Sequence, residues 1–179
     1  AIGSRPVNLH LDCMRKLGAN IDTSNGYIKA SAKGGLKGAN IEFSQVTVTG
    51  TENAIMAATL AKGQTKITNA AKEPEVTDLI KCLNKMGAKI QGEDTDKLII
   101  DGVRELKSTN FSVMPDRIEV ATLMIAAAVT KGDVMVQGVV PDHIEPLIRK
   151  LKEAGAQVNI DPHGVRVIGN GTLQSVDIE

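Results

Sequence analysis

Aromatic side chains are almost absent from the sequence: Phe, Trp and Tyr together make up 2% of its 179 residues, and Trp does not occur. A base-stacking platform and an aromatic sugar-binding cleft both depend on such rings, so these two kinds of site are disfavoured. An excess of one charge is also lacking, because 21 basic and 21 acidic side chains give a formal net charge of zero. We therefore expect no nucleic-acid partner and no binding to an anionic membrane surface through bulk positive charge.

Cysteine and long apolar runs are scarce too. Cys13 and Cys82 are the only cysteines, and both fall in apolar-periodic stretches, which predicts small core residues in a reduced cytoplasmic protein. No run approaches the roughly 18 apolar residues of a membrane span, and no signal peptide is recognisable. His10, His143 and His163 share no ligand spacing with each other or with the cysteines, so we expect no metal site. The sequence contains no glycine-rich loop of the kind that binds the phosphates of a nucleotide cofactor. We therefore expect no cofactor.

The strongest positive signal is an internal repeat of about 68 residues. Three similar segments each end in the dipeptide Gly-Ala. The glycines of these dipeptides are Gly18, Gly87 and Gly155, which are 69 and 68 positions apart. Before each glycine, apolar residues recur at the spacing of one helix face, and the glycine suits the left-handed end of a helix. After it the apolar residues alternate, which is typical of short strands.

A second class of helix is predicted over residues 54–63 and 123–132, which are rich in Ala and apolar nearly all round, as in a helix buried on every side. Each unit is expected to run helix, three short strands, buried helix, strand, and about two and a half units are present. This pattern predicts an α+β (mixed α/β) fold. A compact barrel-like arrangement around the buried helices is favoured over a solenoid.

Polar residues concentrate where loops lead into the predicted helices, and such helix starts favour anions. Arg5 precedes a helix opened by Pro6, and Thr47 and Asp116, 69 positions apart, stand at the same place in successive repeats. The polar groups at the last two junctions exceed what helix capping requires. At the junction of Glu73, capping and solvation suffice as an explanation. His10 occupies a register position that is Leu in the other repeats, which predicts a half-buried packing role.

Four motifs in a fixed order resemble the enolpyruvyl transferases, and most closely the branch that acts on a UDP-linked amino sugar. The motifs are Ile2-Gly3-Ser4-Arg5-Pro6-Val7-Asn8-Leu9-His10, Thr49-Gly50-Thr51-Glu52-Asn53, Asn69-Ala70-Ala71-Lys72-Glu73-Pro74-Glu75-Val76 and Met114-Pro115-Asp116-Arg117-Ile118-Glu119. The resemblance covers essentially the whole chain. It implies two domains, each an inside-out α/β barrel of three repeats with buried helices.

The resemblance also implies a reaction and a set of site residues. The family branch transfers an enolpyruvyl group from phosphoenolpyruvate to the 3′-hydroxyl of UDP-N-acetylglucosamine and releases phosphate, which is the first committed step of bacterial peptidoglycan synthesis. Supporting catalytic roles are implied for Arg5, Glu73 and Asp116. Contacts to the nucleotide sugar are implied for Arg5, Pro6, Val7, Asn8, Leu9, Gln45, Val46, Thr47 and Val48.

The chain departs from the family pattern at several positions. Asn8 stands where the family usually carries Asp, and Gln45 where it often carries Lys. The proton-donating cysteine of the family, which is the target of fosfomycin, would immediately precede Ala1, and neither Cys13 nor Cys82 replaces it. The phosphoenolpyruvate-binding Lys and Arg residues lie outside the sequence as well. Both ends look cut, so a fragment that is inactive without the remainder of the polypeptide is expected.

By the family layout, residues 1–113 form the later part of one barrel domain and residues 114–179 the start of the second. Such a cut would expose apolar helix faces and lead the isolated chain to self-associate. Two alternatives stay open at this point. One is the related transferase that acts on shikimate 3-phosphate, and the other is a non-catalytic nucleotide-sugar-binding or scaffold protein built from the same repeat.

Overall fold

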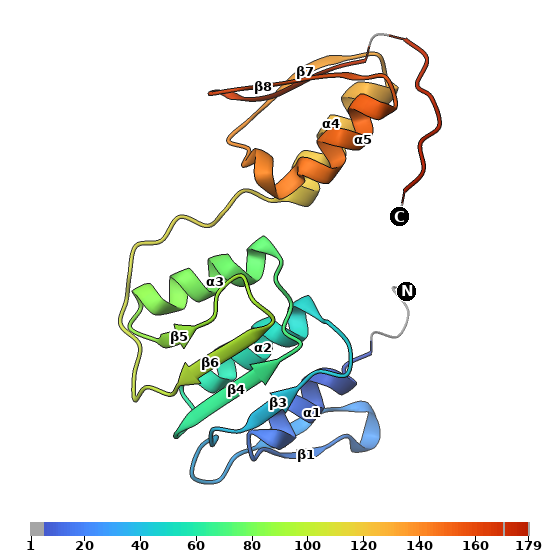
Figure 1. Ribbon diagram of the computed structural model, residues 1–179. Coiled ribbons are helices and arrows are strands. Elements are labelled where there is room, and N and C mark those ends of the chain that lie inside the picture. Colours follow the sequence, from blue (N-terminus) through green and yellow to red (C-terminus); the bar gives the residue numbers. More distant parts are fainter. Residues whose placement is uncertain (1–5, 170, 179) are drawn as a thin grey trace. The chain divides into compact units, whose positions relative to one another are not determined.

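The computed structural model describes residues 6–169 and 171–178, and its fold is mixed α/β, as the sequence predicts. The chain divides into two compact units, Ala1–Ser112 and Val113–Glu179, and each has its own hydrophobic core (Figure 1). Within the described residues, no helix is both long enough and apolar enough to span a membrane.

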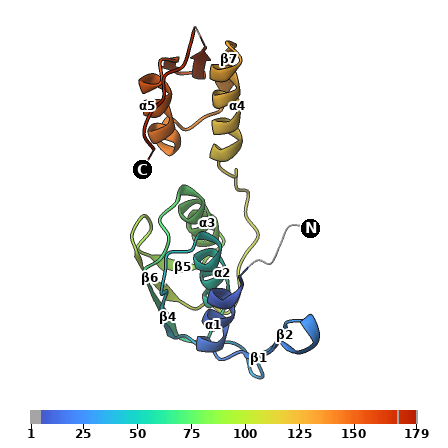
Figure 2. The same cartoon turned by 90° about the vertical axis from the view of Figure 1, so that its right-hand side faces the viewer.

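The first unit combines three α-helices with six short strands. In chain order these are α1 (Asn8–Lys16), β1 (Asn20–Asp22), the 3₁₀ turn η1 (Ser24–Gly26), β2 (Lys29–Ser31), β3 (Asn40–Glu42), α2 (Val48–Thr59), β4 (Gln64–Thr68), α3 (Pro74–Lys85), β5 (Lys89–Gln91) and β6 (Lys97–Asp101). The main sheet has the order β3-β4-β6-β5, in which β3 and β4 are parallel and the other neighbours antiparallel. Helices α2 and α3 lie together on one face of this sheet (Figure 2).

Alternation of side chains along the strands builds the core of this unit. Thr65 and Ile67 of β4 and Leu98 and Ile100 of β6 are buried, while their sequence neighbours point outward. Cys13 of α1 belongs to the same core, and burial raises the pKa of its thiol to about 11, an effect that Lys16 partly offsets. Cys13 is therefore a neutral packing residue, as predicted.

The second unit repeats this topology with fewer strands. It contains α4 (Arg117–Val129), β7 (Asp133–Gln137), the 3₁₀ turn η2 (Pro141–Ile144), α5 (Glu145–Glu153), β8 (Gln157–Asp161) and β9 (Gly164–Ile168). The sheet order β7-β9-β8 matches β4-β6-β5 of the first unit, with antiparallel pairing throughout. Both helices cover one face of this sheet (Figures 1 and 2).

The predicted helix ends are confirmed. Helices α1, α3 and α5 stop just before Gly18, Gly87 and Gly155, whose φ angles of 91°, 102° and 98° lie in the left-handed region that glycine adopts without strain. In each case the residue after the glycine donates its backbone N–H to a carbonyl in the last turn of the helix, at 2.9 to 3.0 Å. This is the hydrogen bond expected at a helix closed by a left-handed residue.

The predicted order of three strands before each buried helix is wrong for the second repeat. Only β5 and β6 precede α4, and residues 102–116 form no strand. Backbone hydrogen bonds instead hold this segment along the first unit, where Val103 donates to Thr59 and Lys107 to Met86. In the first repeat, β1 and β2 form a separate two-stranded sheet, and every residue of β2 is exposed. The repeat visible in the structure is therefore β-α-β-α-β-β, complete from β3 to β6.

The prediction that the Ala-rich helices are buried on every side is also wrong for these residues. Met56 and Leu60 of α2 are 49% and 53% exposed, and Ile125 and Val129 of α4 are 44% and 61% exposed. Each helix packs one face on its own sheet, and the opposite stripe is open to solvent. A helix that is apolar on all faces is expected to have packing neighbours on every side. The described residues cover α2 and α4 on one side only.

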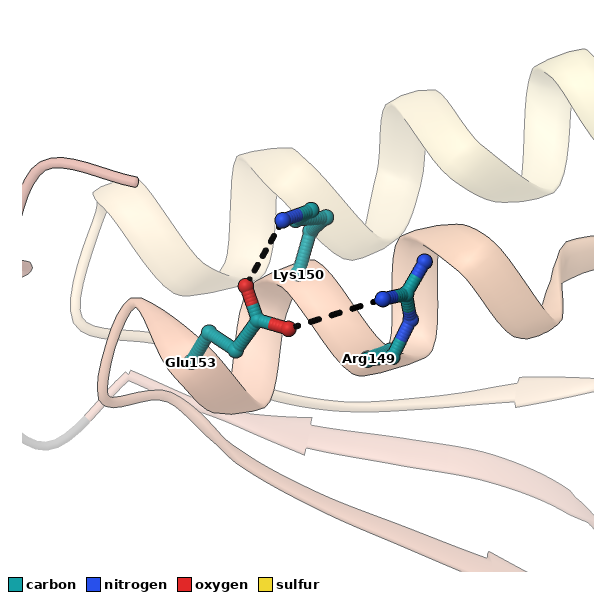
Figure 3. A network of polar contacts seen from close by, with 3 residues as sticks. All are labelled: Arg149, Lys150 and Glu153. Atoms are coloured by element: carbon teal, nitrogen blue, oxygen red, sulfur yellow. Dashed lines mark hydrogen bonds and ion pairs between the residues drawn. The ribbon is translucent and has the colours of Figure 1, made fainter. Parts of the chain in front are cut away.

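The outer surface of α5 is polar. Glu153 accepts a hydrogen bond from Lys150 at 2.8 Å and lies 3.9 Å from Arg149, one turn away (Figure 3). The hydrogen bond from Lys150 lowers the pKa of Glu153. All three side chains are solvent-accessible, so the network makes the helix soluble and adds little to its stability.

Candidate functional site

The candidate site of the first unit lies where two parallel strands end. The carboxyl ends of β3 and β4 are adjacent, and the segments that follow them lead into α2 and α3. Ligands of α/β proteins commonly bind at such an edge, because loops and helix starts converge there. The side chain of Asn69 joins the two segments by donating to the carbonyl of Phe43 at 2.9 Å.

The start of α2 is built by Thr47. Its backbone is extended and its hydroxyl accepts a hydrogen bond from the N–H of Gly50 at 3.2 Å, so Thr47 is the N-cap. Gln45 and Val46 are exposed just before the cap, and Val48 is the first, half-buried residue of the helix. The four residues implied by the resemblance thus form a continuous and largely accessible approach to a helix N-terminus.

A buried hydrogen bond ties the start of α2 to the segment before α3. Thr51 is fully buried, and its hydroxyl accepts from the backbone N–H of Ala71 at 3.0 Å. Ala71 lies two residues before Glu73, so this bond fixes the approach to α3 relative to α2. The sequence marks Thr51 only as a member of a motif, and its partner is separated from it by 20 residues.

Glu73 does not behave as a simple cap. It is the N-cap residue of α3, yet its side chain makes no capping hydrogen bond, and only its backbone carbonyl accepts from Val76 at 2.9 Å. One carboxylate oxygen, Oε2, is buried without a partner among the described residues. A buried oxygen left unpaired is unfavourable, so capping and solvation do not explain this side chain, contrary to the sequence-based interpretation.

Two more carboxylates lie close to this edge. Burial, together with the negative charge of Glu75 on α3, raises the pKa of Glu52 on α2 above its ordinary value. Both side chains are half-buried. A carboxyl whose pKa is raised holds its proton more readily, which suits a place beside anionic groups.

Helix α1 begins beside the same edge. Pro6, Val7 and Asn8 are exposed and Leu9 is half-buried, and no side chain among residues 6–169 caps the helix. The backbone N–H groups of its first turn are therefore available to an anion. Arg5, the guanidinium predicted for this junction, lies outside the described residues.

His10 joins α1 to α2. It is half-buried, as its register predicts, and its Nδ1 lies 3.1 Å from Nδ2 of Asn53. Sequence reasoning missed this pair, although Asn53 is a polar residue inside an otherwise apolar helix. The departure from apolar character at both positions is the signal that points to it.

A cavity of about 350 Å³ opens between α1 and the end of β3. Leu9 and Ser44 contribute to its wall, so it borders both segments implied to contact the nucleotide sugar. Arg15 and Lys16 also line it, and Arg15 is paired with Asp12 at 3.0 Å. The cavity thus runs along α1, and its cationic residues lie in the last turn of that helix.

Asp116 belongs to the second unit and caps α4. Its Oδ1 accepts from the backbone N–H groups of Ile118 at 2.8 Å and Glu119 at 3.2 Å. Asp116 and Thr47 are both N-caps of the Ala-rich helices, which confirms their predicted equivalence. Capping accounts for the hydrogen bonds of Oδ1 within the unit, and the carboxylate remains exposed.

This arrangement suits an anionic ligand rather than a metal ion. Three helices of the first unit begin near one another, and their partial positive charges add. In the described part of the chain, no group of three or more His, Cys, Asp or Glu side chains is placed to hold a metal. Cationic side chains, which a strongly charged ligand requires, are few at the described helix starts.

Comparison with known proteins agrees with this picture. The family model described as EPSP synthase (3-phosphoshikimate 1-carboxyvinyltransferase) matches residues 1–179. The chain belongs to this family of enolpyruvyl transferases.

Its curated relatives point to one branch of the family. The chain is 52% identical over 179 residues to the UDP-N-acetylglucosamine 1-carboxyvinyltransferase of Coxiella burnetii (strain Dugway 5J108-111), which covers 99% of this chain and 41% of the relative. The protein of the same name from Gluconobacter oxydans is 51% identical, with 99% and 43% covered. The chain therefore spans less than half the length of the curated relatives it matches.

Solved structures agree at the level of the fold. An EPSP synthase from Acinetobacter baumannii aligns with a TM-score of 0.73 at 23% identity, over 98% of this chain and 42% of that one. The enolpyruvyl transferase NikO from Streptomyces tendae aligns with a TM-score of 0.78 at 20% identity, over 95% and 43%. The mixed α/β architecture is thus shared despite low identity.

Proposed function

We propose that the full-length protein containing this chain transfers the enolpyruvyl group of phosphoenolpyruvate to the 3′-hydroxyl of UDP-N-acetylglucosamine and releases phosphate. The observation that carries the proposal is the identity of about 50%, over 99% of the chain, to proteins named UDP-N-acetylglucosamine 1-carboxyvinyltransferase. In a bacterium this reaction commits the amino sugar to peptidoglycan, and both substrates are found in the cytoplasm.

The reaction sets clear chemical requirements. A base takes the proton of the 3′-hydroxyl as its oxygen bonds to C2 of phosphoenolpyruvate, and an acid delivers a proton to C3. The tetrahedral product then loses a proton from C3, the C2–O bond to phosphate breaks, and the carbon–carbon double bond returns. Cations must stabilise the phosphate and carboxylate throughout. The described helix starts supply few cations, so we expect other parts of the full protein to contribute the rest.

The first unit is assigned to acceptor binding. Arg5, Pro6, Val7, Asn8 and Leu9 would contact the nucleotide sugar from the start of α1. Gln45, Val46, Thr47 and Val48 would do so from the start of α2. The convergence of these two helix starts supports the assignment, because a diphosphate is stabilised by open N–H groups and helix dipoles.

Two acidic residues are assigned supporting roles near the reacting groups. The buried, unpaired Oε2 of Glu73 supports its assignment, since a carboxylate held in this way lacks a partner that a bound hydroxyl could provide. Asp116 leaves one face of its carboxylate exposed while Oδ1 caps α4, so it is both fixed and accessible. Each is expected to orient substrate rather than to act alone.

Asn8 and Gln45 would make uncharged contacts where the wider family commonly carries charge. Both are exposed, at or next to a helix start. An amide both donates and accepts hydrogen bonds, so these residues would bind a ribose or base edge without adding charge near the diphosphate.

The domain organisation is proposed from the same resemblance. Residues 1–113 would be the later part of one three-unit barrel and residues 114–179 the beginning of another. The β-α-β-α-β-β repeat from β3 to β6 supports this assignment, as do the open apolar stripes on α2 and α4. The remainder of the polypeptide would cover those stripes.

The decisive experiment is phosphate release by the full-length gene product, with UDP-N-acetylglucosamine and shikimate 3-phosphate offered in parallel. Release with the nucleotide sugar alone is the expected result. Release with shikimate 3-phosphate alone would overturn the proposed acceptor in favour of the one named by the family description. The absence of release with both acceptors would favour a non-catalytic binding protein built on the same fold.

A further inference from the structure

The His10–Asn53 contact connects the two helices whose first turns are assigned to acceptor binding. Nδ2 of Asn53 can only donate, so Nδ1 of His10 is the acceptor of this 3.1 Å contact. Both side chains are half-buried. A hydrogen bond at this depth is directional and fixes the rotation of one helix relative to the other.

The internal repeat carries other residue types at the positions of this pair. Leu79 on α3 and Leu147 on α5 occupy the register position of His10, and Thr122 on α4 occupies that of Asn53. Thr122 is exposed, and its hydroxyl donates a hydrogen bond to the carbonyl of Ile118 in the same helix. Among the described residues, this polar pair therefore occurs only at the junction between α1 and α2.

The surroundings of the pair make α1 sensitive to it. In the described part of the chain the start of α1 has no side-chain cap, and its first turn is held by backbone bonds such as Leu11 N–H to the carbonyl of Val7 at 3.0 Å. The start of α2, in contrast, is fixed by Thr47 and by the buried bond from Ala71 to Thr51. Asn53 therefore lies on the better-anchored helix and holds the less-anchored one.

We propose that Asn53 is a positioning residue that acts through His10, setting the first turn of α1 against α2 so that residues 6–9 and 45–48 grip one acceptor molecule. The inference rests on the proposed function and deepens it. Loss of the bond should weaken acceptor binding while leaving phosphoenolpyruvate binding and turnover nearly unchanged, because the described chain places neither residue at the reacting groups.

The test uses the full-length gene product and steady-state kinetics with both substrates varied. Asn53→Leu and His10→Leu should each raise the KM for UDP-N-acetylglucosamine about tenfold, which corresponds to about 1.4 kcal/mol. The KM for phosphoenolpyruvate and kcat should stay within about twofold. The double variant should be no worse than either single variant, since both remove the same interaction.

Two further variants separate positioning from packing. His10→Asn retains an acceptor oxygen near the place of Nδ1 and should restore the acceptor KM to within about threefold of the original value. Thr122→Val, at the equivalent position of α4, should change nothing. Thermal unfolding of each variant shows whether any effect follows stability instead.

Each outcome is decisive. An unchanged acceptor KM in Asn53→Leu, with wild-type turnover of the nucleotide sugar intact, would overturn the inference and leave the proposed function standing. If both KM values rose and kcat fell together with the Tm of the variant, the pair would serve packing alone. That result would also overturn the inference. Wild-type protein that does not use the nucleotide sugar would remove the proposed function and the inference together.

Discussion

The two Ala-rich helices, α2 and α4, occupy the same place in successive repeats but have different neighbours. The positions of Gly50, Ala54 and Ala57 are largely covered in α2, whereas Glu119 and Leu123, the equivalents of the first two, are exposed in α4. Helix α1 packs against α2, and within the second unit no helix takes that position on α4. At Ala54 the residue is thus small where the site is buried, and its equivalent Leu123 is large where the site is exposed.

Some features of the repeat are therefore shared by both units, and others depend on the neighbours that each unit has. The α-β-α-β-β path, the glycine at each helix end and the capped start of the Ala-rich helix are common to both units. The packing of a helix in the position of α1 on the Ala-rich helix is found, within the described residues, in the first unit only. Sequence changes at the covered positions should therefore act in one unit only, while changes at shared positions should act in both.

The largest effect is expected at a shared glycine. Gly102 and Gly169 donate their N–H groups to Gly63 and Gly132, at 2.9 and 2.8 Å, just after the Ala-rich helices. A Cβ at Gly102 would lie 1.7 Å from the carbonyl oxygen of Ala61, and one at Gly169 would lie 2.5 Å from that of Ala128. Gly102→Ala should destabilise the first unit by ~3 kcal/mol, and Gly169→Ala the second by ~2 kcal/mol.

Urea denaturation followed by hydrogen exchange of peptides from each unit would measure both effects. A loss of protection confined to the substituted unit is expected. If either alanine variant kept the stability of the original protein, Gly102 and Gly169 would not be equivalent positions of close backbone contact.

The covering of α2 is tested by exchanging residues between the repeats. Ala54→Leu introduces the residue found at Leu123, but at a site that is completely buried, and it should destabilise the first unit by ~2 kcal/mol through overpacking. Leu123→Ala, at a site 48% exposed, should change stability by less than ~0.5 kcal/mol. Chemical denaturation of both variants gives the comparison, and equal effects would contradict it.

The helix caps should show a smaller difference. Asp116 accepts two backbone N–H groups and carries a negative charge at a helix start, whereas Thr47 accepts one. Asp116→Ala should cost about 1 kcal/mol of stability in the second unit, and Thr47→Ala somewhat less in the first. Asp116→Asn is the matched control, because it keeps an acceptor and removes only the charge. Thermal unfolding would rank the three variants.

The smallest effect concerns pH. Arg166 donates two hydrogen bonds to Asp133, at 2.6 and 2.7 Å, and these lower the pKa of Asp133 below its ordinary value of 3.8. A depressed folded-state pKa stabilises the fold above the unfolded-state pKa, and this stability is lost as the pH falls through the folded-state value. The second unit should lose stability slightly below about pH 4, and Arg166→Gln should abolish that dependence. Gln64 takes the place of Asp133 in the first unit, which is the internal control.

Local features of this fold are readable from the sequence, and features that depend on distant partners are not. The spacing of Gly18, Gly87 and Gly155 locates three helix ends, and the offset between Thr47 and Asp116 identifies two equivalent caps, because both signals reside in a few neighbouring residues. The separate β1–β2 sheet and the strandless stretch after β6 depend on tertiary contacts, such as Lys107 with Met86, that no local pattern records.

The candidate site divides in the same way. Its segments are recognisable as polar junctions, but the bonds that assemble them join residues 20 and 43 positions apart, namely Thr51 with Ala71 and His10 with Asn53. The interpretation of Glu73 as a solvated cap failed because burial of a single carboxylate oxygen depends on the whole surrounding unit. Residue type predicts what a site can do, and tertiary structure decides which atoms meet.

Strand β4 has β3 beside it, whereas β7, its counterpart, is an edge strand in the described part of the chain. An open edge offers a row of backbone donors and acceptors to any other extended chain, and Val134 and Met135 on β7 are both more than a third exposed. The charge of Asp133, fixed by Arg166 on the neighbouring strand, stands at one end of that row. A charged residue at such an edge disfavours pairing with another extended chain, and Asp133 holds that position on β7.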